Sequence, residues 1–290
     1  MHSDIQYILK EFAKEFDKQL EKNLPDGVPQ ELFSAIKYSL LSGGKRIRPF
    51  LFLESAKVAG YKNPQDLMDI AIAIEMIHTY SLIHDDLPAM DDDDYRRGKP
   101  TCHKVYGEAI AILAGDGLLT YAFKKMAQIK TISPEKLLKV ISLIADKTGL
   151  GGMVAGQAAD ILAEEGKFTD IKFIHQNKTT KFIEACCEAG AIAADRPDLV
   201  EKFKTYGYNV GMAFQIWDDI LDEIGDEKKL GKKTGKDREK NKLTYVSVYG
   251  LEKAIQIAKE HIKTGIEAIK DLENNENLIN LAKFIVSREV

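Results

Sequence analysis

The chain has 290 residues, of which 44% are hydrophobic and 30% charged, with a formal net charge of −4 and a pI near 5.9. This length and composition suffice for one large core, and no Ser- or Pro-rich linker interrupts the sequence, so we expect a single domain over residues 1–290. The slightly acidic balance gives no sign of nucleic-acid binding. No apolar run is long enough to span a membrane and no signal-peptide pattern opens the chain, which predicts a cytoplasmic protein without membrane insertion.

Hydrophobic periodicity predicts helices along the whole chain. No segment shows convincing strand alternation, and no repeat of fixed period is found. The predicted fold class is therefore all-α, a bundle of ten or more helices around a central cavity. The predicted helices cover residues 4–23, 29–41, 50–59, 63–86, 108–129, 134–145, 170–194, a segment after Pro197 that contains Gln215, and finally 251–272 and 276–288.

Two glycine-rich stretches lie between these helices. In the turn at residues 42–49, Gly43 and Gly44 let backbone amides approach an anion, while Lys45 and Arg48 can close on it from the side. A plain exposed turn is the alternative for this stretch. The second, residues 149–160, does not follow a strand, so it is a poor nucleotide-binding pattern and favours close approach of helices instead.

An acidic run follows the long helix that ends near Asp86. It gathers six carboxylates and then three basic residues: Asp85, Asp86, Asp91, Asp92, Asp93, Asp94, Arg96, Arg97 and Lys99. Because Pro88 ends the helix, Asp85 and Asp86 lie in its last turn, where the helix dipole disfavours a bare carboxylate. A divalent cation removes that conflict, and Mg²⁺ is commonly held by one or two carboxylates. His84 is expected to orient a ligating carboxylate. A solvated acidic loop is the alternative.

A second acidic cluster, Asp218-Asp219-x-x-Asp222, follows another apolar run. On a helix Asp218 and Asp222 lie one above the other, and like charges at this spacing destabilise a helix that binds no cation. Two such clusters, each closing an apolar helix, favour metal binding over two solvated loops.

With these residues in view, the chain resembles the trans-isoprenyl diphosphate synthases, and among them the bacterial farnesyl diphosphate synthases. The first motif of that family is present as Asp85-Asp86-x4-Asp91 followed by Arg96-Arg97-Gly98, and the second as Asp218-Asp219-x2-Asp222. The resemblance covers nearly the whole length and implies one polyprenyl synthetase domain with the isoprenoid synthase fold. It also implies a homodimer that joins isopentenyl diphosphate head-to-tail to dimethylallyl and geranyl diphosphate.

The resemblance assigns residue roles as well. It implies about three Mg²⁺ ions held by Asp85, Asp86, Asp91, Asp218, Asp219 and Asp222. Isopentenyl diphosphate would contact Lys45, Arg48, His78 and Arg97, and the allylic diphosphate Arg96 and Lys178. Thr179 and Gln215 would turn oxygen dipoles toward a carbocation, and Lys232 and Lys242 would hold the leaving diphosphate. Gln157 and Asp160 match a further family element without a fixed contact.

Product length is predicted from Tyr80, about one and a half turns before Asp85, where a bulky ring would stop the growing chain at fifteen carbons. A geranylgeranyl or other-length synthase and a catalytically inactive subunit are the alternatives. A terpene cyclase has no second diphosphate to bind, so Lys45, Arg48 and Arg97 argue against it. A phosphohydrolase is a weaker alternative, because no second His supports His84.

Overall fold

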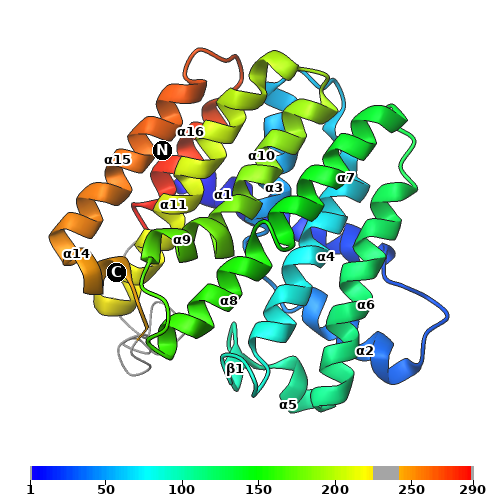
Figure 1. The fold of residues 1–290 in the computed structure, drawn as a ribbon. Helices are drawn as coiled ribbons and strands as arrows, with labels where there is room; N and C mark the ends of the chain where they lie inside the picture. The colour runs from blue at the N-terminus through cyan, green and yellow to red at the C-terminus, as the bar shows by residue number, and fades with distance from the viewer. Residues whose placement is uncertain (1, 225–241, 289–290) are drawn as a thin grey trace. The chain divides into compact units, whose positions relative to one another are not determined.

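The computed structural model describes residues 2–224 and 242–288, which are predominantly helical, as predicted (Figure 1). The chain divides into two compact units. We call residues 6–50 and 65–137 the N-terminal unit, and residues 1–5, 51–64 and 138–290 the C-terminal unit. Four elements run from one unit into the other: α1 (His2–Lys22), α3 (Ile47–Val58), the 3₁₀ turn η1 (Pro64–Leu67) and α7 (Pro134–Thr148).

The N-terminal unit is built around α4 (Met68–Asp85), which packs against α2 (Gln30–Leu40) and α6 (Glu108–Ala127) (Figure 1). Every residue from Ile70 to Ile77 on α4 is buried, which explains why its sequence is apolar on all sides rather than along one stripe. The short helix α5 (Cys102–Tyr106) joins the same group. The acidic run leaves the C-terminal end of α4, so a rigid buried helix fixes where the run begins.

The centre of the C-terminal unit is α11 (Val200–Ile224), which packs against α10 (Lys181–Ala193) and α15 (Leu251–Ile269). A buried cluster that includes Met212, Ile216 and Ile220 lies directly beside the second acidic motif. The remaining elements of this unit are α8 (Met153–Glu164), α9 (Ile171–His175), the π-helical turn η2 (Gln176–Thr180), the 3₁₀ turn η3 (Pro197–Leu199), α14 (Tyr245–Tyr249) and α16 (Glu276–Ile285).

Most of the glycine-rich stretch 149–160, namely residues 153–160, belongs to α8. Two local features were not predicted. The helix expected over 170–194 is present as α9 and α10, but the π turn η2 lies between them. Two short antiparallel strands, β1 (Tyr95–Arg96) and β2 (Lys99–Pro100), follow the acidic run, where no strand was predicted. This hairpin forms because Arg97 and Gly98, with φ of 54° and 76°, make the two-residue turn that suits the twist of paired strands.

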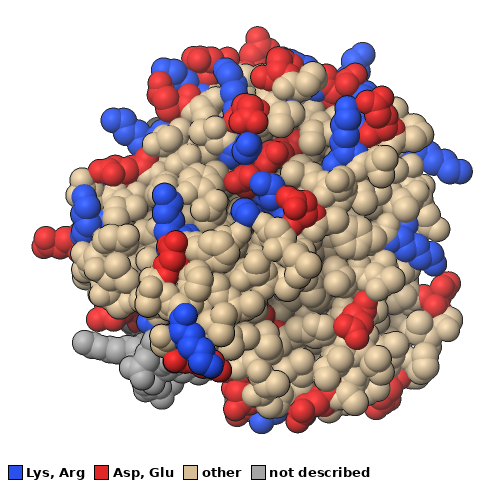
Figure 2. All heavy atoms as spheres, in the orientation of Figure 1, with Lys and Arg blue, Asp and Glu red and all other residues tan. Residues whose placement is uncertain are grey.

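On the face shown in Figure 2, basic and acidic side chains are interspersed among larger uncharged areas, as expected of a chain with 41 Lys and Arg against 45 Asp and Glu. Among residues 2–224 and 242–288, no helix is long and apolar enough to cross a membrane.

Candidate active site

The first acidic motif begins where α4 ends. Asp85 is the last residue of α4 and Asp86 is its C-cap, as predicted. The chain then turns back on itself, because the Asp91 amide donates to the Asp85 carbonyl at 2.8 Å and the Asp92 amide to the Leu87 carbonyl at 3.1 Å. This turn brings the backbone of Asp91 against that of Asp85. The six-residue spacing of the two aspartates therefore closes a local structure.

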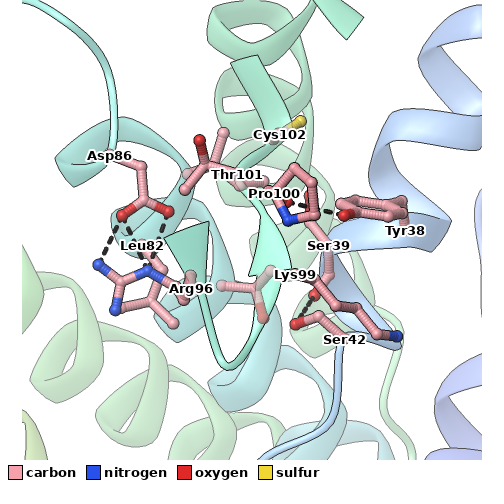
Figure 3. Close-up of a pocket in the computed structure, with 12 residues that line it drawn as sticks. Tyr38, Ser39, Ser42, Leu82, Asp86, Arg96, Lys99, Pro100, Thr101 and Cys102 are labelled. Atoms are coloured by element: carbon pink, nitrogen blue, oxygen red, sulfur yellow. Dashed lines mark hydrogen bonds and ion pairs between the residues drawn. The ribbon is translucent and has the colours of Figure 1, made fainter. Parts of the chain in front are cut away.

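Asp86 forms a fork-like ion pair with Arg96 of β1 (Figure 3). Arg96 Nε lies 2.8 and 2.9 Å from the two carboxylate oxygens, and Arg96 Nη2 lies 2.6 Å from Oδ1. Asp86 is only 3% exposed, and burial raises its pKa, with Asp93 and Asp91 adding to the rise and Arg96 opposing it. The hairpin thus carries a guanidinium that compensates a buried carboxylate.

A small cavity of about 30 Å³ adjoins this ion pair (Figure 3). Its volume is on the scale of a water molecule, so it is too small for a prenyl chain. Its lining includes several hydroxyl groups and comes from α2 and the turn after it, the end of α4, the hairpin and the start of α5: Tyr38, Ser39, Ser42, Thr79, Leu82, Ile83, Asp86, Arg96, Lys99, Pro100, Thr101 and Cys102.

The hairpin turn also carries Arg97 to the predicted anion-binding turn. Its guanidinium donates to the Gly43 carbonyl, and a Cβ on Gly44 would lie 2.7 Å from the guanidinium carbon. Gly44 therefore leaves room for this cation. Arg97 holds a positive φ that a non-glycine residue rarely adopts, which costs of the order of 1 kcal/mol.

Arg48 and His78 meet in the same unit, with Arg48 Nη1 lying 3.3 Å from His78 Nε2. Burial lowers the pKa of His78 well below its usual value, and the charges of Arg48 and Arg97 lower it further. The ring is therefore neutral at pH 7 and can accept from the guanidinium. The structure brings together three of the four predicted isopentenyl diphosphate contacts, beside the turn that holds the fourth, the exposed Lys45.

Arg46, in the same turn, has a structural role. It is 3% exposed and donates to Asp17 at 2.8 Å and to the buried Glu75 at 2.6 Å. Its charge is thus already balanced within the protein.

The prediction for His84 was wrong. Its ring does not orient a carboxylate of the acidic motif but faces α6, with Nε2 3.1 Å from the Ile112 carbonyl. Gly115 permits this contact, because a side chain there would overlap the imidazole.

Tyr80, one turn earlier, is 7% exposed and packs edge-on against His84 at 5.8 Å between ring centroids. Burial, assisted by the negative charge of Asp85, raises the pKa of Tyr80 to about 12.

The second acidic motif lies on the last turns of α11, as predicted, and its members have partners from distant parts of the chain. Asp218 accepts from Arg288 Nη1 at 2.8 Å, and the Arg288 guanidinium lies 4.6 Å over the Phe214 ring. Asp219 accepts the backbone N–H of Tyr245, the first residue of α14, at 2.8 Å. Asp219 and Asp222 are buried. The sequence pattern did not reveal these partners, because Tyr245 and Arg288 approach α11 only through the tertiary fold.

Three predicted residues meet around the π turn η2. Thr179 Oγ1 donates to Gln215 Oε1 on α11 at 2.8 Å, and Lys178 Nζ donates to Asp160 Oδ2 on α8 at 2.6 Å. A glycine on α8 and another on α11 allow these two helices to pack closely against η2. A Cβ on Gly156 would overlap the Lys178 backbone, and one on Gly211 would lie 2.9 Å from Thr180 Cα. The close helix approach expected of the 149–160 stretch is confirmed, and Asp160 now has a contact.

The structure describes one of the two lysines that were predicted to hold the leaving diphosphate. Lys242 lies 3.5 Å from Glu164 at the end of α8. Lys232 falls outside the described residues.

The carboxylates suit Mg²⁺ by their chemistry, since Mg²⁺ takes oxygen ligands and keeps several positions for water or phosphate. Within residues 2–224 and 242–288, no three His, Cys, Asp or Glu side chains form a preformed metal group. Asp85 and Asp91, tied together by their backbone contact, place two carboxylates on one turn. This arrangement fits an ion whose remaining ligands come from a bound diphosphate.

Residues 29–282 match the polyprenyl synthetase family model. The chain belongs to the polyprenyl synthetase family. It is 45% identical to farnesyl diphosphate synthase of Bacillus subtilis over 90% of each chain. It is 46% identical to geranylgeranyl diphosphate synthase of Cyanophora paradoxa over 90% of this chain and 89% of that protein. The crystal structure of geranylgeranyl pyrophosphate synthetase from Pyrococcus horikoshii is similar over 99% of both chains, with a TM-score of 0.88 and 36% identity. The predicted family and fold are confirmed.

Proposed function

We propose that this polyprenyl synthetase family member makes farnesyl diphosphate by adding isopentenyl diphosphate to dimethylallyl and then geranyl diphosphate. Family membership makes it a prenyltransferase that elongates prenyl diphosphates. One observation carries the proposal further: the N-terminal unit gathers Arg48, His78 and Arg97 in addition to the Asp86–Arg96 pair. That grouping supports a second diphosphate site, which a synthase needs and a cyclase does not.

The acidic motifs serve the ionisation of the allylic substrate in this proposal. The bond between C1 and the diphosphate oxygen breaks, leaving a delocalised carbocation and free diphosphate. Mg²⁺, about three ions by family resemblance, would be held by Asp85, Asp86, Asp91, Asp218, Asp219 and Asp222 and would neutralise the charge of the leaving group. Arg96, Lys178, Lys232 and Lys242 add cationic donors to that diphosphate.

The π turn stabilises the cation. Because Thr179 gives its hydroxyl hydrogen to Gln215, the lone pairs of Thr179 Oγ1 stay available to positive charge. The isopentenyl double bond then attacks the cation, with its diphosphate held by Lys45, Arg48, His78 and Arg97. A proton is lost to the released diphosphate, and the new prenyl diphosphate is longer by five carbons. No protein nucleophile is required.

Tyr80 sets the product at fifteen carbons in this proposal. It stands five residues before Asp85 on the rigid α4, about 7 Å along the helix axis, and its ring is buried. The relatives include both farnesyl and geranylgeranyl synthases, so family membership alone does not decide the length.

The test incubates the purified protein with Mg²⁺, radiolabelled isopentenyl diphosphate and dimethylallyl diphosphate, and separates the products by carbon number. We expect a fifteen-carbon product, and a shift to twenty carbons or more in Tyr80→Ala. The control Tyr7→Ala changes an exposed ring and should leave the product unchanged. A longer product from the wild-type chain would overturn the role of Tyr80, and no condensed product would favour an inactive subunit. A homodimer and a cytoplasmic location remain predictions, for light scattering and cell fractionation.

A further inference from the structure

His175, which the sequence pattern did not single out, lies against the second acidic motif. It is the last residue of α9, its side chain is 6% exposed, and its Nε2 lies 3.3 Å from Asp219 Oδ2. The same oxygen accepts the Tyr245 backbone N–H at 2.8 Å. The rings of His175 and Tyr245 are stacked, with centroids 5.0 Å apart and planes inclined by 23°. Asp219 is therefore contacted at one oxygen by two groups that also pack on each other.

The other ring nitrogen of His175 has no hydrogen-bond partner within the described residues, although it is buried. A buried histidine with a purely structural role normally satisfies both nitrogens, and an unsatisfied one costs about 1–3 kcal/mol. A carboxylate only accepts hydrogen bonds, so the tautomer that suits Asp219 carries its hydrogen on Nε2.

We propose that His175 is a positioning residue that fixes the orientation of the Asp219 carboxylate toward the metal–diphosphate complex. The inference rests on the proposed function, in which Asp219 is a metal ligand. The imidazole adds a contact at Oδ2 to that of the Tyr245 amide. Two contacts at one oxygen restrict rotation of the carboxylate and so set the direction of Oδ1. Partners behind metal ligands of this kind typically change metal affinity 10- to 100-fold when removed.

His175 is adjacent in sequence to residues of the proposed allylic site. It directly precedes the π turn, from which Lys178 reaches Asp160 and Thr179 reaches Gln215. One continuous segment therefore contacts Asp219 and carries two of the proposed allylic-site residues. A π turn in a helix is common at functional sites, because it redirects side chains that a regular helix would point elsewhere.

The experiment uses Trp217, the only tryptophan of the chain, which precedes Asp218 and Asp219 on α11. Its fluorescence is recorded while Mg²⁺ is titrated into protein with inorganic diphosphate. His175→Phe keeps a ring to stack on Tyr245 but has no donor, and we expect apparent Mg²⁺ affinity to fall about ten-fold. His175→Gln retains an amide donor and should recover part of that loss. His175→Leu replaces the Phe variant if circular dichroism shows that the latter is unfolded.

His261→Gln is the matched control, because His261 contacts α11 through Asn209 at 2.8 Å and lies away from the acidic motif. It should titrate like the wild type. Wild-type Mg²⁺ affinity in His175→Phe, with only a lower melting temperature, would overturn the proposal. The variant Asp219→Asn distinguishes a failure of the positioning role of His175 from a failure of the proposed function. If Asp219→Asn binds Mg²⁺ and diphosphate normally, the metal assignment itself is wrong. If it loses binding while His175→Phe does not, only the positioning role is lost.

Discussion

The two acidic motifs have similar sequences but are held in different ways. The first is a local structure at the end of α4, closed by a backbone contact between Asp91 and Asp85 and balanced by Arg96 ten residues away. The second stays helical on α11, and its partners Tyr245 and Arg288 lie 26 and 70 residues away in the chain. The first motif thus depends on its own loop, and the second on the packing of the C-terminal unit.

This difference predicts that mutating the second motif affects folding as well as chemistry. Asp219 carries the first amide of α14 and faces His175, whereas Asp85 occupies the last turn of α4, where a negative charge is disfavoured. A mutation at Asp85 should therefore leave stability nearly unchanged, or slightly raise it. A mutation at Asp219 should lower it.

The largest effect is expected on catalysis. Asp85→Ala and Asp219→Ala should each lower kcat/KM by on the order of 10³-fold, because each removes a ligand that stabilises the leaving diphosphate. Only Asp219→Ala should also lower the melting temperature. Asp92→Asn is the control within the acidic run, since Asp92 is not a predicted ligand and asparagine tolerates its positive φ. Unchanged turnover in either alanine variant would remove that metal assignment.

Next in size is the effect of filling the space beside the π turn. In Gly156→Ala the new methyl group would overlap the Lys178 backbone, so η2 must move away from α8. We expect a loss of about 2–3 kcal/mol in unfolding free energy, together with a lower kcat, because Lys178 and Thr179 move with the turn. Gly117→Ala on α6 is the control, since its nearest neighbour is 4.0 Å away and alanine favours helices. Equal stability of the two variants would contradict the close packing of η2.

The sequence predicted those features that local rules determine. The long apolar run of α4, the arrest of that helix before Pro88 and the helical spacing of Asp218 and Asp222 follow from periodicity and helix-end chemistry. The π turn was missed because one wide turn hardly disturbs a helical pattern. Arg288 was missed because its contact with Asp218 depends on the whole C-terminal unit.

The two arginine–carboxylate pairs give a smaller and more direct comparison of the motifs. Asp86 is buried, so Arg96→Gln leaves a carboxylate with little water and should cost about 2 kcal/mol. The Asp218 side chain is 32% exposed, and Arg288→Gln should cost about 1 kcal/mol or less. Urea unfolding of both variants measures the difference. A larger loss in Arg288→Gln would mean that the C-terminal segment, not the hairpin, carries the more important pair.

A pH-dependent effect tests whether buried acids in general behave like the two motifs. Glu184 and Glu188 on α10 are both buried, and Lys147 Nζ donates to Glu184 at 2.8 Å. Burial, assisted by the neighbouring Glu184, raises the pKa of Glu188 from 4.5 to about 7. The unfolded chain then releases this proton near pH 4.5 and the native state only near pH 7, so native stability falls as pH rises through this window.

Glu188→Gln keeps a neutral side chain at every pH and should remove that fall. We expect the variant to be more stable than the wild type by about 3 kcal/mol at pH 8 and nearly equal at pH 4.5, as measured by urea unfolding at both pH values. Glu201→Gln, at an exposed position of α11, should change neither value. If Glu188→Gln is instead destabilised at pH 8, the carboxylate is ionised and paired, and α10 then holds a buried charge as the two aspartate motifs do.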